Sequence, residues 1–62
     1  MRKHELLQMA AYKRDQAARF RKMGRGLSLA KDRETMAEYA TALEREANQL
    51  EAEAGAMDGV SG

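Results

Sequence analysis

A seven-residue recurrence in the second half of the chain constrains the fold more than any other feature. Large apolar residues recur at every seventh position, namely Leu29, Met36, Leu43, Leu50 and Met57. Between them, at spacings that alternate between four and three, lie Arg33, Ala40, Ala47 and Ala54. This is the a/d pattern of a coiled coil, with the small residue at a and the large residue at d.

The first half of the chain repeats the pattern less regularly. Its d series is Leu6, Lys13, Phe20 and Leu27, and its a series is Lys3, Ala10, Ala17 and Gly24. Small a residues in both halves allow two helix axes to approach closely. The spacing therefore predicts an all-α protein, an antiparallel helical hairpin whose two helices meet along one packing seam. The predicted seam consists of Leu6, Ala10, Ala17, Phe20, Leu29, Met36, Ala40, Leu43, Ala47 and Leu50.

Glycines place the helix ends. The chain has 62 residues and no proline, and Gly24 and Gly26 form its first glycine cluster. Glycine readily adopts the positive φ that ends many helices, and Ser28 is a candidate N-cap for a second helix. These signals predict helices over 4–24 and 28–55 in a single hairpin domain of residues 1–55. Residues 56–62, rich in glycine, are expected to form a flexible tail.

Apolar residues outside the seam predict association. Leu7, Met9, Met23 and Tyr39 widen the apolar stripe beyond the a and d positions. A helix with such a wide stripe usually has two neighbours. A chain of this size also buries only about 60 % of its unfolded surface, so one hairpin is a marginal fold. We therefore expect a homodimer in which two hairpins form a four-helix bundle.

Charge is divided unevenly between the two halves. Residues 1–26 hold eight Lys and Arg against two acids, whereas residues 27–62 hold three against eight. In one interpretation the two halves pair across the hairpin. Arg14 and Arg21 then lie near Glu38 and near Asp32 or Glu34. Arg2 and Lys3 lie beside the end of the second helix, near Glu46, Glu51 and Glu53. In the other, a basic surface on the first helix binds nucleic acid through Arg14, Arg21, Lys22 and Arg25, with Tyr12 and Phe20 as neighbouring aromatics.

Groups for catalysis or for a bound cofactor are few. There is no cysteine and only one histidine, His4, so neither a nucleophile–base pair nor the usual zinc ligands can be assembled. The a and d positions lack the inward Glu and His of carboxylate-bridged metal bundles. No apolar run is long enough to span a bilayer. We expect a cytoplasmic protein without enzymatic activity, metal or cofactor.

Two resemblances add to this interpretation. The two helices with small a and large d residues resemble ROP-type hairpins, and that resemblance implies a dimer that binds RNA. The pattern Asp32-Arg33-x-x-Met36-x-x-Tyr39-Ala40-x-x-Leu43-Glu44, preceded by Tyr12 and Arg21, is similar to a set of short uncharacterised bacterial helical-hairpin proteins. That second resemblance implies no particular activity. The predicted function is a small interaction or regulatory protein that self-associates and presents helix surfaces to a protein partner. The alternative is a ROP-like dimer that binds RNA or DNA through the basic first helix.

Overall fold

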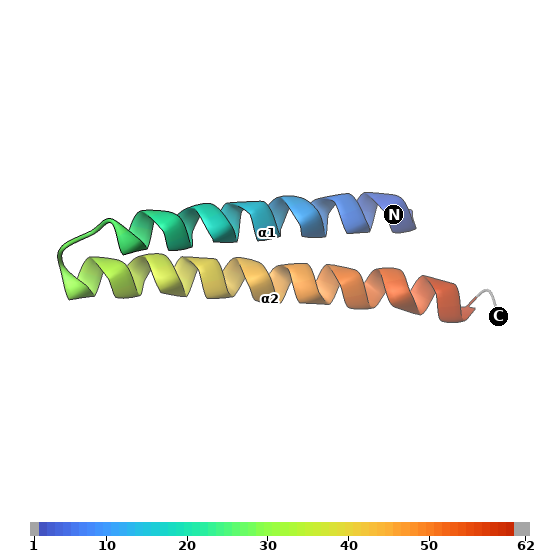
Figure 1. The fold of residues 1–62 in the computed structure, drawn as a ribbon. Coiled ribbons are helices and arrows are strands. Elements are labelled where there is room, and N and C mark those ends of the chain that lie inside the picture. Colours follow the sequence, from blue (N-terminus) through green and yellow to red (C-terminus); the bar gives the residue numbers. More distant parts are fainter. Residues whose placement is uncertain (1, 61–62) are drawn as a thin grey trace.

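Two antiparallel helices make up the described part of the chain. The computed structural model describes residues 2–60, with the side chains of residues 2–57. Helix α1 spans Lys3–Arg25 and helix α2 spans Ala30–Val60. They pack along each other as a hairpin 51 Å long and 14 by 13 Å across (Figure 1). The prediction of an all-α helical hairpin is confirmed.

The ends of α2 differ from those predicted from the glycines. The helix begins at Ala30 rather than at residue 28, and it continues through Gly55 and Gly59 to Val60. A glycine inside a helix is less favourable than alanine by only about 1 kcal/mol, and the high helix propensity of the surrounding Ala and Glu residues offsets this cost. Residues 56–60, predicted as part of a flexible tail, are therefore helical, and residues 61–62 of that tail lie outside the described residues.

The connection at residues 26–29 closes without a left-handed glycine. Gly26 has φ −87° and ψ −6°, and no residue in the described range has a positive φ. Its amide donates to the carbonyl of Met23 at 3.1 Å, and the amide of Leu27 donates to that of Gly24 at 3.2 Å. Because α2 begins at Ala30, Ser28 does not hold the predicted N-cap position. The Arg33 guanidinium instead stabilises the connection by donating to the carbonyls of Leu27 and Ser28, at 3.0 and 3.1 Å.

The two helices meet along a row of small residues. In α1 the buried residues are Leu6, Ala10, Ala17 and Gly24, and in α2 they are Ala40, Ala47 and Ala54. Gly24 lies against Met36, so an a residue of α1 faces a d residue of α2. Seven-residue steps along both helices then pair Ala17 with Leu43 and Ala10 with Leu50. Each layer thus combines one small and one large residue, which keeps the helix axes close.

The large d residues are less buried than the seam prediction implies. Phe20, Met36, Leu43 and Leu50 are only half-buried. Leu29 is 65 % exposed, and its placement in the seam is wrong because it precedes α2 in the connection. Since the alanines bring the helix axes together, the large side chains extend out of the interface along one side of it.

Candidate interaction surfaces

Apolar side chains gather on one side of the seam. On a helix with a heptad repeat, the d and g positions lie on one side of the a residues, and the e positions lie on the other side. Several large apolar residues occupy d and g positions of the two helices and therefore lie on the same side. We call them the apolar face: Met9, Phe20, Met23, Tyr39, Leu43 and Leu50. Met9, Met23 and Tyr39 are exposed, and the other three are half-buried. The apolar face therefore runs along both helices and presents large side chains to solvent.

An aromatic pair lies at the end of this face nearer the connection. The rings of Phe20 and Tyr39 contact each other across the two helices, with centroids 5.6 Å apart and planes inclined at 58°. Such tilted geometry is favourable for aromatic pairs. Both rings line a shallow hollow together with Ala42, Leu43 and Glu46. The hollow is open and mostly apolar, so it can receive an apolar side chain but does not enclose a small molecule.

The four residues predicted as a dimer or partner surface do not share one side. Met9, Met23 and Tyr39 belong to the apolar face, at g positions. Leu7 is at an e position, seven residues from Arg14, and so lies on the opposite side of the seam. All four are exposed, as the prediction required, but Leu7 is separated from the other three by the buried alanines.

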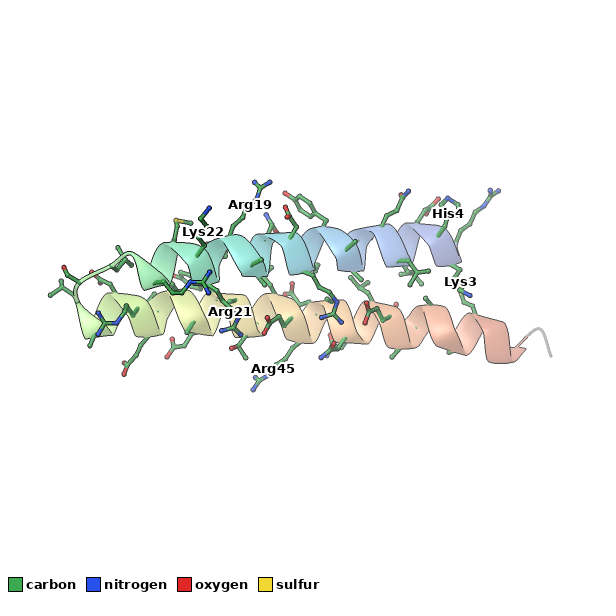
Figure 2. The ribbon with its side chains drawn as sticks, viewed as in Figure 1. Lys3, His4, Arg19, Arg21, Lys22 and Arg45 are labelled. Atoms are coloured by element: carbon green, nitrogen blue, oxygen red, sulfur yellow. The ribbon has the colours of Figure 1, made fainter. Side chains whose placement is uncertain are left out.

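Two arginine–glutamate pairs span the side that carries Leu7. Arg21 donates to both carboxylate oxygens of Glu44, at 2.6 and 3.1 Å. Arg14 donates to both oxygens of Glu51 and, at 2.8 Å, to the side-chain oxygen of Asn48. We call these five residues the charged face. Figure 2 shows Arg21 extending from α1 to α2. Because all are exposed or nearly so, the pairs add more to the choice of register than to stability.

The pairs shift the protonation equilibria of both carboxylates in one direction. The hydrogen bonds from Arg21 hold the pKa of Glu44 below its usual value, and those from Arg14 do the same for the pKa of Glu51. Desolvation opposes this shift in both cases. The pKa values of the two arginines are raised by the same hydrogen bonds. Both pairs therefore stay charged at neutral pH.

The interhelical interpretation of the charges is supported, but the predicted partners are wrong. Arg21 was expected near Asp32 or Glu34 and Arg14 near Glu38, whereas the structure pairs them with Glu44 and Glu51. The prediction centred the turn on residues 24–27. The connection continues to residue 29 and Gly24 faces Met36, so each residue of α1 meets a later residue of α2. Lys3 extends toward the end of α2 as expected, while Glu46 and Glu51 pair with residues nearer the centre (Figure 2).

The four candidate nucleic-acid contacts fall into two groups. Arg14 and Arg21 are engaged by carboxylates. Lys22 points away from α2 beside Arg19 (Figure 2). Neither Lys22 nor Arg25 forms an ion pair within the described residues. Arg25 lines a shallow groove beside the connection together with Arg21 and Arg33. Arg21 and Arg25 therefore share a groove, whereas Lys22 points away from α2.

One charge pair lies within the apolar face. The Nζ of Lys13 is 2.8 Å from an Oε of Glu46. The sequence placed Lys13 in the d series of the first helix, but it did not identify a partner for it. The seven-residue spacing could have suggested Glu46, since that residue shares the g position with Tyr39. A further ion pair joins Asp15 and Arg19 at 3.1 Å; it lies on the outer surface of α1 and both of its residues belong to that helix.

Further chemistry is limited in the part of the chain that the structure describes. No three His, Cys, Asp or Glu side chains there come together as metal ligands would. Neither described helix has the length and apolarity needed to cross a membrane. Comparison with protein-family models, curated proteins and solved structures finds no match to this chain. The two helix surfaces are therefore the candidate functional sites.

Proposed function

We propose that this chain is a non-enzymatic helical interaction protein. Two copies associate through the apolar face into a four-helix bundle, and the bundle presents its remaining helix surfaces to a protein partner. This function needs neither a cofactor nor a metal. The resemblance to ROP-type hairpins and to short bacterial helical-hairpin proteins is in keeping with it.

One observation carries the proposal. Among the described residues, the fully buried side chains are alanines and one leucine, and no large side chain is completely enclosed. Even with the half-buried Phe20, Met36, Leu43 and Leu50, this is a small core for a chain of 62 residues, since each buried methylene contributes only about 0.8 kcal/mol. Phe20, Leu43 and Leu50 become fully buried only if something covers the apolar face. A second copy supplies that cover without any further gene product.

Sedimentation equilibrium tests self-association directly. We expect a mass near twice the 6.9 kDa of the chain and a melting temperature that rises with protein concentration. A monomer mass combined with a concentration-independent melting temperature would contradict the proposal.

Two matched substitutions locate the interface. Met9 and Leu7 are two residues apart in α1 and are 40 % and 41 % exposed, but they lie on opposite sides of the seam. Met9→Glu places a charge in the apolar face and should dissociate the dimer. Leu7→Glu should leave it intact. Equal effects of the two changes would show that the apolar face is not the interface.

Nucleic-acid binding is the second candidate, and the groove lined by Arg21, Arg25 and Arg33 favours it. If it binds RNA or DNA, Lys22→Glu with Arg25→Glu should weaken binding and reduce its salt dependence by about one unit of slope for each lost phosphate contact. Purification of the tagged protein from its native cells, with and without nuclease, separates the two classes. Protein partners that survive nuclease support the first proposal, and partners that depend on intact nucleic acid support the second.

A further inference from the structure

The Lys13–Glu46 pair lies on the same side of the seam as the large side chains of the apolar face. Lys13 lines a hollow with Met9, Tyr12 and the polar residues Glu5 and Gln8. Glu46 lines the mostly apolar hollow that contains Phe20, Tyr39 and Leu43. The two side chains are 27 % and 51 % exposed in the hairpin. Covering the apolar face would therefore remove this pair from solvent together with its apolar neighbours.

Burial of a charge pair carries a desolvation cost, which apolar residues at the same positions would avoid. Lys13 stands at a d position, where the flanking members of its series are Leu6 and Phe20. Polar residues at single core positions of coiled coils are best known for selecting one register and one oligomeric state at the expense of stability. The position of Lys13 is therefore more consistent with a role in specificity than with a role in stability.

We infer that the Lys13–Glu46 pair sets the alignment of a second copy of this chain on the apolar face. This inference rests on the proposed self-association and specifies its geometry. A two-fold axis that runs parallel to the helices beside the pair brings Lys13 of each copy against Glu46 of the other. The four charges then alternate in sign around the axis, and each ammonium has two carboxylate neighbours. An axis across the helices would instead bring Lys13 against Lys13 and Glu46 against Glu46.

Other alignments of the two hairpins are disfavoured by the same charges. A shift of one heptad along the helices would break the two-fold symmetry and would move Glu46 of one copy against the ring of Phe20 of the other, leaving a buried charge without a partner across the interface.

Charge reversal with mixing tests the inference. Lys13→Glu gives a chain with two carboxylates at this site, and Glu46→Lys gives a chain with two ammonium groups. Each variant alone should form homodimers at least about tenfold more weakly than the unmodified chain, because like charges then face each other. An equimolar mixture should form heterodimers with near-original affinity, measured by native mass spectrometry and sedimentation equilibrium. Because the heterodimer is the readout, the test does not depend on either variant folding alone.

The mixture distinguishes contacts between copies from contacts within one hairpin. If the pair acts only inside the hairpin, neither variant regains its Lys–Glu contact on mixing, and heterodimers gain nothing. The controls are two single variants, Asp15→Lys and Arg19→Glu. Both alter the outer surface of α1 and should leave the affinity of the homodimer unchanged. Homodimers of both site variants as tight as the original would overturn the inference while leaving self-association in place. An unmodified chain that is monomeric at every concentration would instead overturn the proposed function, and this inference with it.

Discussion

Gly24 in α1 lies directly against Met36 in α2. A Cβ built on Gly24 would be 3.1 Å from the Cβ of Met36 and 3.7 Å from the carbonyl oxygen of Arg33. Ordinary carbon–carbon contacts are about 3.5–4.0 Å. The absence of a side chain therefore allows the helices to approach at this layer. Glycine is needed here for space, since its backbone is helical and its φ is not positive.

Substitution of Gly24 by leucine should destabilise the hairpin. The added side chain has no room beside Met36, and overpacking of this kind costs about 1–3 kcal/mol. Urea unfolding followed by circular dichroism measures the change. The matched control is Gly55→Leu, because no atom lies within 4 Å of a Cβ at that helical position. Equal losses at both sites would show that contact with Met36 is not the cause.

Replacement of Gly55 by alanine should stabilise the protein by about 0.5–1 kcal/mol. Gly55 lies inside α2 with open space around it, so alanine gains helix propensity without a clash. The increase should appear as a higher urea midpoint. An unchanged midpoint would mean that α2 already frays at residue 55, as the glycine-rich sequence suggested.

The cost of truncating Leu43 should depend on protein concentration. Leu43 is half-buried in the hairpin and lines the hollow beside Phe20 and Tyr39. Where the apolar face is covered, Leu43→Ala should cost about 2–5 kcal/mol, the range for a buried leucine. When the protein is diluted until it is monomeric, Leu43→Ala should lower the free energy of unfolding by less. Leu29→Ala is the control and should have little effect at either concentration, since Leu29 is exposed. A loss for Leu43→Ala that is the same at both concentrations would argue against coverage of this residue by a second copy.

The sequence predicted the hairpin because a seven-residue spacing reports which residues share a helix face. The seam residues Ala10, Ala17, Ala40 and Ala47 that it predicted are buried, since small residues at most a positions leave few other packings. The sequence could not predict the partners of Arg14 and Arg21. These depend on how many residues the connection uses and on which layer Gly24 joins, and neither quantity is encoded in the periodicity. The exposed position of Leu29 was missed for the same reason.

Exchanging the charges of Arg21 and Glu44 should restore a stability that either single change lowers. Arg21→Glu places two carboxylates together, and Glu44→Arg places two guanidinium groups together. The double variant reforms the pair with opposite polarity, so its melting temperature should exceed that of both single variants. Arg19→Glu is the comparison, because its pair with Asp15 lies within α1 and has no role between the helices. Strictly additive effects of the two changes would show that Arg21 and Glu44 do not interact in solution.

Acidification should weaken the hairpin through Glu44 and Glu51. Both carboxyls have pKa values lowered by hydrogen bonds from arginine in the folded chain. The unfolded chain therefore takes up protons first as the pH falls, and the stabilisation present above the unfolded pKa of about 4.3 is lost as the pH drops through the lower folded values. Thermal melts between pH 7 and pH 2 should show this loss. A variant with Glu44→Gln and Glu51→Gln should start less stable at pH 7 and lose less over the same interval. If it instead lost as much as the unmodified chain, the two carboxylates would not be the groups responsible.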